Sequence, residues 1–387
     1  MGKESFAESC FGHLKILFPD AAAAGRSAFP LEYLAGAQTV NLSPSLYGKI
    51  QKAIADTFAW THTDSYADQL RPHLSKQDQE ILDFKTEQFS VLMAYDFHVD
   101  PNTQQARLIE VNTNGAGYLF AYLSYLTHGL KPFPQINPLM VLKNSFTSEL
   151  QLFDGGGTSH ILIMDETLKQ QKMYPEFLLY EDLFRQWGFS ASLIDFEDLE
   201  FHAQTNKVAG GNFIYNRYCD FLLRERRSEK LRAAYLTKVV GLSPQPKEYL
   251  LIADKQRMVE WGLAPDLPDT IAEVLLKTKD ISEFSDPDTL WTERKHWFFK
   301  PKRSHGGKST YRGKSITKGT FERLLKEDTL VQEYFPAAET EDGQWKYDIR
   351  FYVYKDRIQL ATARVYKGQV TNFSTPQGGF APIVVSG

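Results

Sequence analysis

The chain has 387 residues, a formal net charge of -4, and 42% hydrophobic and 24% charged residues. These values predict an ordinary globular protein of two or three packed subdomains. They exclude a protein that binds nucleic acid through a general basic excess, because such a surface normally needs a positive net charge.

The cysteines and the apolar segments exclude further classes of protein. Cys10 and Cys219 belong to no Cys-x-x-Cys pair, which argues against a zinc ribbon or a dithiol redox site. No apolar run approaches the length that spans a bilayer, and the first residues lack the apolar stretch of a signal peptide. We therefore expect a cytoplasmic protein with no membrane partner.

Residues 1–150 form the first of three expected parts. Hydrophobic spacing predicts an amphipathic helix over residues 45–58. Two strand-like runs, 89–99 and 106–112, flank the turn sequence Asp-Pro-Asn-Thr and predict a hairpin.

The middle part, residues 151–250, begins after the flexible sequence Asp-Gly-Gly-Gly. A buried-type strand starts at His160, and a helix over 174–188 ends at Gly188. Two more strands follow, in FSASLIDFEDL and NFIYNR. Strand, helix, strand is typical of a parallel βαβ unit, so we expect a small parallel α/β domain inserted between two other parts.

The last part, residues 251–387, shows a short helix at 255–262 and strands at 296–301 and 330–335. A second hairpin is expected from residues 345–354 and 358–366, followed by a loop at 371–382. The predicted fold class is therefore α/β in the broad sense, with α+β character outside the inserted domain.

A first polar motif lies in the early hairpin. Glu110 and Asn112 are two residues apart on a strand, so their side chains point to one face. A carboxylate and an amide oxygen suit Mg²⁺, and Asp96 on the partner strand is expected within about one residue of Glu110. The alternative is a solvated edge strand that ends in an Asn-Gly turn.

A second motif combines a lysine with a glycine-containing loop. A strand delivers Lys300, and the loop that follows holds Ser304, Gly306, Gly307 and Lys308. Backbone N–H groups of such a loop can cradle phosphates. A Walker A motif is disfavoured because Lys302 stands where that pattern needs glycine. A basic solvated loop is the alternative.

The late hairpin carries a third set of charges. Asp348 lies on one strand and Arg364 on the other, and Arg364 can grip a carboxylate or stabilise an oxyanion. Gly378 and Gly379 favour a mobile lid. Cross-strand ion pairing is the alternative for these charges. Lys255 at a helix start and Arg217 at a strand end complete the set, and a structural ion pair is equally compatible with Arg217.

Together these motifs resemble the ATP-grasp superfamily. Because Glu110 and Asn112 precede Lys300 by a whole domain, the circularly permuted order resembles the eukaryotic-type glutathione synthetases and their relatives. The resemblance implies an ATP-grasp fold with an inserted α/β domain. It also implies ATP and Mg²⁺ as cofactors, and an ADP-forming carboxylate–amine ligase that acts through an acyl phosphate.

The resemblance also assigns residues to roles. Catalytic roles fall to Arg364 and Lys300, and Mg²⁺ would be held by Glu110 and Asn112. ATP contacts are implied for Lys255, Lys300, Ser304, Gly306, Gly307, Lys308, Gln332, Glu333, Tyr334 and Asp348, with the strand of Gln332 meeting adenine through its backbone. Substrate contacts are implied for Arg217, Arg364, Asn372, Gly378 and Gly379. Ser304 stands where the glutathione synthetases have a metal-binding glutamate, so Asp96 or Asp348 would have to supply the third acidic ligand.

The expected substrates are a small carboxylate and an amine, such as an amino acid or a small peptide. Two other hypotheses stay open, an ATP-binding protein without ligase activity and a scaffolding protein. The sequence also leaves the oligomeric state open, with a homodimer as one possibility.

Overall fold

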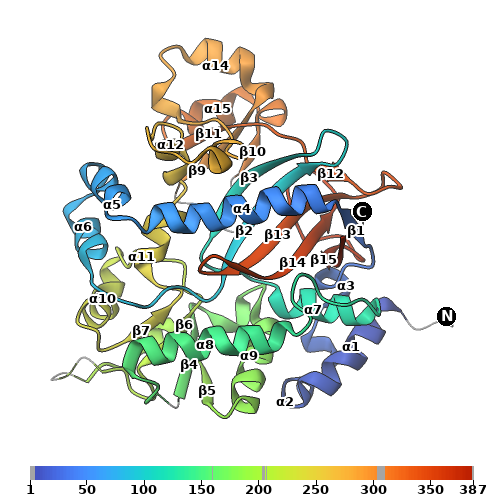
Figure 1. Ribbon diagram of the computed structural model, residues 1–387, viewed down its shortest axis with the longest axis vertical. Coiled ribbons are helices and arrows are strands. Elements are labelled where there is room, and N and C mark those ends of the chain that lie inside the picture. Colours follow the sequence, from blue (N-terminus) through green and yellow to red (C-terminus); the bar gives the residue numbers. More distant parts are fainter. Residues whose placement is uncertain (1–4, 159, 203–204, 206, 303–309, 386–387) are drawn as a thin grey trace.

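The structure is a computed structural model that describes residues 5–158, 160–202, 205, 207–302 and 310–385. Its core sheet is antiparallel and combines strands from both ends of the chain, in the order β15-β14-β13-β2-β3, with β12 paired to β13 (Figure 1). Both predicted hairpins are confirmed, and β13 lies beside β2, which joins them into one sheet. The strands are β2 (Met93–Asp100), β3 (Gln105–Asn112), β12 (Ala338–Glu339), β13 (Lys346–Tyr354), β14 (Arg357–Tyr366) and β15 (Gly379–Ala381).

The helix α4 (Pro44–Thr61) covers one face of the core sheet (Figure 1). Pro44 opens the helix, and the Ser43 hydroxyl caps it by accepting a hydrogen bond from the Leu46 N–H at 3.2 Å. Its apolar stripe, which includes Ile50 and Ile54, packs in one cluster with sheet residues such as Tyr95. The helix predicted over residues 45–58 is confirmed.

A second, smaller antiparallel sheet has the order β10-β9-β11-β8 and lies at the top of Figure 1. It has its own apolar cluster, which includes Phe299, Phe321 and Val331, against α14 and α15. Its strands are β8 (Thr278–Asp280), β9 (Trp297–Pro301), β10 (Tyr311–Arg312) and β11 (Thr329–Glu333). The nearby helices are α12 (Arg257–Trp261), α13 (Asp269–Ala272), α14 (Pro287–Glu293) and α15 (Lys318–Leu324).

The predicted βαβ unit is confirmed as a parallel sheet of order β5-β4-β6-β7, at the bottom of Figure 1. Helix α9 ends at Gln186, and Gly188 follows with a φ of +94°, a conformation that favours glycine. The strands are β4 (His160–Asp165), β5 (Ser190–Asp195), β6 (Phe213–Asn216) and β7 (Gly241–Ser243). The helices are α8 (Pro138–Asp154), α9 (Tyr174–Gln186), α10 (Glu229–Leu236) and α11 (Pro246–Glu248).

The remaining elements lie around these three sheets. The N-terminal helices pack near α7, and β1 pairs with β16 in parallel, which ties residue 40 to residue 383. The division of the chain into segments 1–150, 151–250 and 251–387 stays a prediction. These elements are α1 (Phe6–Leu17), α2 (Pro19–Ala22), α3 (Leu31–Leu34), α5 (Asp64–Leu70), α6 (Lys76–Asp83), α7 (Tyr118–Thr127), β1 (Val40–Leu42) and β16 (Ile383–Val385), with a π-helix at Tyr249–Ala253.

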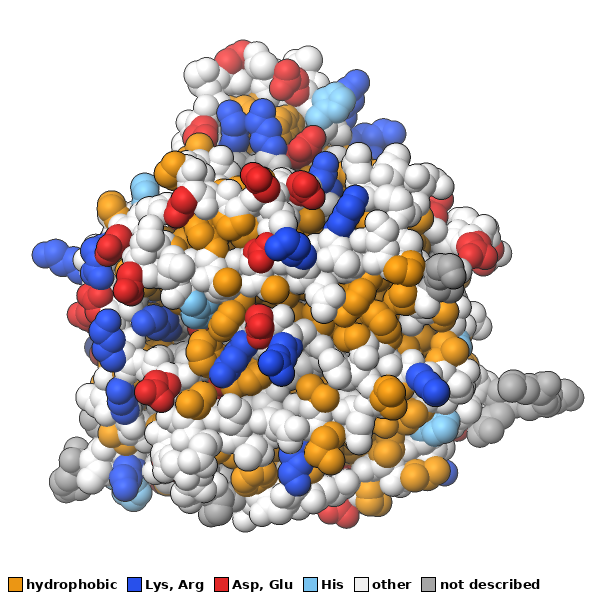
Figure 2. Space-filling model, in the orientation of Figure 1, with side chains coloured by type: hydrophobic (Ala, Val, Ile, Leu, Met, Phe, Trp, Pro, Cys, Tyr) orange, Lys and Arg blue, Asp and Glu red, His pale blue; other side chains and the backbone are white. Residues whose placement is uncertain are grey.

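The surface is mixed in charge. On the face in Figure 2, acidic and basic side chains are interspersed, and hydrophobic side chains gather around the place that β13 and β14 take in Figure 1. Among the described residues, none of the helices combines the length and the apolar character that crossing a membrane requires.

Glu149 on α8 is a buried carboxyl group outside the polar face of the core sheet. It is fully buried, accepts hydrogen bonds from the Phe89 N–H at 3.0 Å and the Tyr354 hydroxyl at 2.7 Å, and its burial raises its pKa from 4.5 to about 7. Between pH 4.5 and about 7, this carboxyl group is therefore protonated in the folded state and ionised in the unfolded state. Its contribution to stability is complete below pH 4.5 and is lost as the pH rises through about 7.

In the unmodified protein, the free energy of unfolding should fall by up to about 3 kcal/mol over this pH window because Glu149 ionises. We expect Glu149→Gln to remove this fall. Glutamine resembles the protonated carboxyl in shape but does not titrate. Urea denaturation at pH 5, 6 and 7 measures the effect, with the exposed Glu322→Gln as the control. An unchanged pH slope in the Glu149 variant would contradict this expectation.

Candidate functional site

The face of the core sheet opposite α4 carries the predicted polar residues. Asp96 pairs in register with Glu110 on one side and with Arg350 on the other, and Asp348 pairs with Arg364. The expectation that Asp96 lies within one residue of Glu110 is confirmed. The polar set consists of Asp96, Glu110, Asn112, Asp348, Arg350 and Arg364.

Four of these residues form a buried ion-pair network. Arg350 donates to both carboxylate oxygens of Asp96 at 2.7 Å, and Arg364 Nη2 lies 2.9 Å from Asp96 Oδ2. Arg364 also donates to both oxygens of Asp348, at 2.6 and 2.9 Å. Two guanidinium groups thus neutralise two carboxylates in a place where an unpaired charge would be costly.

This network bears on the predicted metal role of Asp96, which stays a prediction. The side chain is fully buried, and both of its oxygens accept hydrogen bonds from arginines, so a metal ion would have to displace them. It is better understood as the group that orients Arg350 and Arg364. For Asp348 and Arg364, the alternative of cross-strand ion pairing holds. Arg364 would therefore contact a substrate only through the N–H groups that these bonds leave unused.

A β-bulge in β3 brings the core sheet into contact with the small sheet. Asp96 pairs with Glu110 but Phe97 pairs with Leu108, which leaves Ile109 as the extra residue. The Ile109 carbonyl accepts a hydrogen bond from Lys300 Nζ at 2.9 Å and a longer one from Gln332 Nε2 at 3.5 Å. The bulge therefore lets Leu108 pack in the core while Glu110 faces the lysine.

A narrow cavity lies between the two sheets at this contact. Its space amounts to about one water molecule in this conformation. Charged side chains and apolar side chains both line it. The lining residues are Ile109, Glu110, Val111, Ile252, Ala253, Asp254, Lys255, Met258, Thr278, Lys300, Leu330 and Gln332.

Two lysines, Lys255 and Lys300, and two carboxylates, Glu110 and Asp254, line this cavity. Burial lowers the pKa of Lys300 to about 8, an effect that Glu110 opposes and Lys255 increases. Burial also lowers the pKa of Lys255, and Glu110 is the first group that opposes it. The structure thus brings Glu110, Lys255 and Lys300 together from distant parts of the chain. Lysines whose charged form is disfavoured by burial are stabilised by an anionic ligand.

The strand β11 provides Gln332 to the cavity, whereas Glu333 and Tyr334 lie elsewhere. The Glu333 side chain is exposed. Its N–H donates to Lys277 O at 2.8 Å, and the Tyr334 N–H donates to His296 O at 2.8 Å. These two N–H groups are therefore already used within the protein, and the adenine contact of this strand stays a prediction.

The loop after β3 connects the core sheet to the inserted domain. Arg350 and Tyr352 both donate to the Ala116 carbonyl, at 3.1 and 2.8 Å. Glu176 of α9 accepts from the N–H groups of Gly117 at 2.8 Å and Leu119 at 3.1 Å. Gly117 has a φ of +92°, and a Cβ there would lie 1.8 Å from the Phe380 ring, so the close contact requires glycine.

Arg217 meets this same loop, just beyond the carboxyl end of β6. It is 5% exposed, donates to the Tyr215 hydroxyl at 3.2 Å and lies over the rings of Phe177 and Tyr215. Its carbonyl accepts from Asn114 Nδ2 at 2.9 Å. The electrostatic influence of Glu176 reaches both Arg217 and Arg350, so Arg217 and the polar sheet face converge at residues 113–117.

The C-terminal loop is less like a lid than predicted. Gly379 begins β15 and pairs with Val365, and both Gly378 and Gly379 are buried. Asn372 donates to the carbonyls of Lys367 at 2.8 Å and Val370 at 2.9 Å, so it holds its own loop together. Thr371 donates to Asp348, which anchors the loop beside the ion-pair network.

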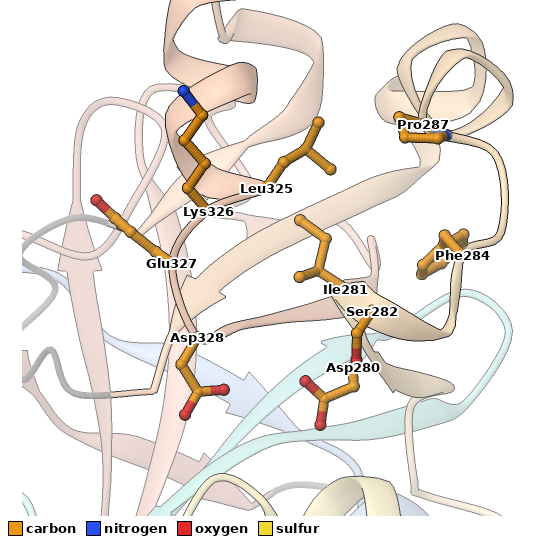
Figure 3. Close-up of a pocket in the computed structure, with 9 residues that line it drawn as sticks. All are labelled: Asp280, Ile281, Ser282, Phe284, Pro287, Leu325, Lys326, Glu327 and Asp328. Atoms are coloured by element: carbon orange, nitrogen blue, oxygen red, sulfur yellow. The ribbon is translucent and has the colours of Figure 1, made fainter.

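Ser304, Gly306, Gly307 and Lys308 of the predicted phosphate loop lie outside the described residues. Lys302, just before them, forms ion pairs with Asp280 at 3.0 Å and Asp328 at 2.6 Å. These carboxylates border a separate, shallow hollow on the small sheet, between residues 280–287 and 325–328 (Figure 3). Its lining includes no residue of the Glu110 cavity.

The metal prediction rests on Glu110 and Asn112. Asn112 Nδ2 lies 3.2 Å from both Glu110 Oε1 and Asp96 Oδ2, so its nitrogen faces the carboxylates. Within the described ranges, no three His, Cys, Asp or Glu side chains gather as a metal site. One carboxylate and one amide fit an ion such as Mg²⁺ that takes most of its ligands from phosphates and water.

Sequence reasoning missed three structural features here. The adjacent apolar pair Leu108-Ile109 interrupts strict alternation and was a visible sign of the bulge. Arg350 is visible on the strand face, but its pairing with Asp96 depends on β13 lying beside β2. The contact of Glu176 with Gly117 has no sequence signal, because the two residues lie on different domains.

We expect Asp96→Asn to destabilise the protein by about 3–5 kcal/mol, because it leaves two buried guanidinium groups short of a counter-charge. Chemical denaturation measures the change. Asp356→Asn, the same change at an exposed position between β13 and β14, is the control, and we expect it to cost less than about 1 kcal/mol. Equal losses in the two variants would mean that the network does not stabilise the sheet.

Comparison with known proteins agrees with this architecture. The sequence matches no protein-family model and no curated protein. The fold is similar to that of a glutathione synthetase-like effector from Globodera pallida, with a TM-score of 0.55 and 10% identity over 96% of this chain and 97% of that one. It is also similar to a gamma-glutamylcysteine synthetase candidate from Methylobacillus flagellatus KT, with a TM-score of 0.50 and 9% identity over 88% and 89% of the two chains.

At these identities the likenesses establish the fold alone, and the circularly permuted order stays a prediction. The two proteins match almost end to end, which includes both the core sheet and the inserted domain. The chain therefore shares its overall fold with these two proteins.

Proposed function

We propose that this protein is an ATP- and Mg²⁺-dependent ligase that joins a small carboxylate to an amine. The observation that carries the proposal is the meeting of Glu110 with the buried Lys300 and the half-buried Lys255 at the junction of two sheets. Such a junction suits a nucleotide whose phosphates offset the lysine charges.

The direction of β3 supports a spatial order of the ligand groups along the site. Ile109 and Glu110 lie in the cavity, Asn112 follows, and the loop of residues 113–117 meets Arg217. In this arrangement the base lies among the apolar residues and the phosphates lie at the lysines. The carboxylate substrate, an amino acid or small peptide, lies toward Arg217, within reach of the terminal phosphate.

The reaction that fits this arrangement has two steps. The substrate carboxylate attacks the terminal phosphorus, which gives an acyl phosphate and ADP. The amine then attacks the acyl carbon, which gives an amide, inorganic phosphate and a proton. Lys300 and Lys255 stabilise phosphate charge, and the remaining donors of Arg364 can orient the substrate carboxylate. Glu110 and Asn112 would hold Mg²⁺, which would offset phosphate charge.

Binding requires room that the present conformation does not have. Because the cavity holds only about one water molecule, we expect the small sheet to move away from the core sheet when a nucleotide enters. The hydrogen bond from Lys300 to Ile109 O is the contact that opens, which frees the amine for phosphate.

The pKa of Lys300 gives a first test. Near pH 8 about half of this amine is uncharged in the free protein, and bound phosphate favours its charged form. We expect ATP binding at pH 8–9 to take up a proton, and the affinity to fall by up to about tenfold per pH unit above pH 8. Isothermal titration calorimetry in two buffers of different ionisation enthalpy measures the uptake.

Two variants separate this effect from a general one. Lys300→Met removes the proton uptake and most of the affinity. Lys302→Met removes the same charge two residues later, from a lysine paired to Asp280 and Asp328, and keeps both. Loss of uptake in both variants, or in neither, would rule out Lys300 as the titrating group.

The ligase activity itself is tested by ADP release from Mg-ATP with pooled amino acids and small peptides, and mass spectrometry identifies any amide product. We expect turnover that depends on both a carboxylate and an amine, and that falls at least a hundredfold in Glu110→Ala. Nucleotide binding without turnover in any pool would point instead to a binding protein of the same fold. Absence of Mg-ATP binding would reject the proposal.

A further inference from the structure

We propose that His62 is a positioning residue for Lys255, because its ring holds Glu248 at the start of the π-helix that leads to Lys255. The inference rests on the nucleotide site proposed above and concerns what keeps one lysine of that site in place. It also makes the site sensitive to pH through His62, which does not line the cavity.

Lys255 belongs to a cavity wall that begins with a π-helix. It lines the cavity, and the π-helix Tyr249–Ala253 ends two residues before it. π-Helices are rare and short, and a single turn depends on contacts from other elements. The Asp254 N–H donates to the Tyr249 carbonyl at 2.8 Å, so the residue after Glu248 is bonded to the residue before Lys255. A displacement of Glu248 is therefore passed on to Lys255.

The junction of α4 and α5 provides two contacts to this segment (Figure 1). At the start of the π-helix, Glu248 Oε1 lies 2.9 Å from His62 Nε2. Within the π-helix, the Leu251 carbonyl accepts a hydrogen bond from the Tyr66 hydroxyl at 2.8 Å. Burial raises the pKa of Tyr66, so this hydroxyl keeps its proton at ordinary pH. The Tyr66 contact is therefore permanent, whereas the His62 contact can titrate.

The partners of the His62 ring define how many protons it carries. Nδ1 lies 2.8 Å from the Phe58 carbonyl oxygen, which can only accept. Thr61 Oγ1, at 3.4 Å from Nδ1, accepts as well, because its own hydrogen goes to Thr57 O at 2.7 Å. An ionised Glu248 also only accepts, so both ring nitrogens need a hydrogen. The pair of His62 and Glu248 therefore holds one proton that it loses as the pH rises, whichever of the two side chains carries it.

The surroundings make the loss of this proton costly. Glu248 is 3% exposed, and the His62 ring lies against the rings of Phe58 and Phe89, at centroid distances of 4.1 and 5.7 Å. Burial lowers the pKa of His62, but the charge of Glu248 and the hydrogen bonds of the ring outweigh burial, so its pKa lies above 6.5. The stabilisation of this contact is thus complete below pH 6.5 and is lost as the pH rises through the raised pKa.

Other titratable groups face the pair. Lys247 acts on His62, and Glu149 of α8 acts on Glu248. Glu149 ionises near pH 7, so it adds a second buried negative charge in the same pH range and strengthens the need for a protonated ring. Lys355 acts on Glu149, and Asp64, Asp83 and Lys85 act on Lys247. The raised pKa values of the neighbouring tyrosines keep them neutral; these are Tyr95, Tyr235 and Tyr354.

Hydrogen–deuterium exchange of the full chain without ligand tests the pH dependence. The measurement compares peptides that cover residues 248–255 at pH 5.5 and 8, corrected for the intrinsic pH dependence of exchange. We expect protection in the unmodified protein to fall at least about threefold at the higher pH, because one of the two contacts is lost. His62→Arg keeps the charge and should keep the protection, whereas His62→Gln should show the lower protection at both pH values.

Three control variants separate this effect from general loosening. Tyr66→Phe removes the permanent contact, so it should lower protection by a similar factor at both pH values. His202→Gln, at an exposed histidine of the inserted domain, should change nothing. In Glu149→Gln the fall in protection should persist, which assigns it to His62 rather than to Glu149.

A double-mutant cycle tests the link to Lys255. Binding of Mg-ATP is measured by isothermal titration calorimetry at pH 6, where Lys300 is charged and its own titration does not contribute. We expect His62→Gln to weaken binding at least about threefold in the unmodified chain and His62→Arg to restore it. Lys255→Met keeps Lys300 and therefore measurable binding. In that background His62→Gln should have no further effect.

The outcomes that contradict the inference are distinguishable. Protection of residues 248–255 that is independent of pH, or that keeps its pH dependence in His62→Gln, would overturn the role of His62. An equal effect of His62→Gln with and without Lys255 would overturn the positioning role and leave the nucleotide site intact. Absence of Mg-ATP binding by the unmodified protein would remove the nucleotide site, and this inference with it.

Discussion

The burial of Lys300 is the constraint around which the junction of the two sheets is organised. Its amine reaches the carbonyl of Ile109, which the bulge in β3 leaves available, and it faces Glu110. A buried ammonium group needs both an acceptor and nearby negative charge. The bulge and Glu110 provide these from the core sheet, so the position of the small sheet depends on a charge that only the other sheet can satisfy.

The remaining charges on the polar sheet face are arranged differently. Asp96 and Asp348 are neutralised by Arg350 and Arg364 within the sheet, at distances of 2.6–2.9 Å. The lysines, by contrast, have a depressed pKa because burial disfavours their charged form. One set of charges therefore stabilises the sheet, whereas the other remains suited to an anionic ligand. The two sets adjoin at Glu110, which pairs in register with Asp96.

The loop of residues 113–117 connects the core sheet to the inserted domain through buried hydrogen bonds. Main-chain groups of the loop are held by Arg350 and Tyr352 from the core sheet and by Glu176 from α9. The carbonyl of Arg217 is held in turn by Asn114. Because these hydrogen bonds are buried, the inserted domain has a defined orientation relative to the sheet. A substrate held by Arg217 would thus have a defined position relative to the phosphate end of the cavity.

The sequence by itself determined the local elements and much of the chemistry. Periodicity and turn residues were enough for the helix at 45–58, both hairpins and the βαβ unit, because these depend on interactions between near neighbours. The spacing of Glu110 and Asn112 fixed a common face for the same reason. Only the tertiary structure decided which charges are already paired. Asp96 and Arg364 read as ligand-binding groups in the sequence, but β2, β13 and β14 lie side by side and neutralise them. Ion pairing and desolvation depend on three-dimensional neighbours, and distant segments of the chain supply them.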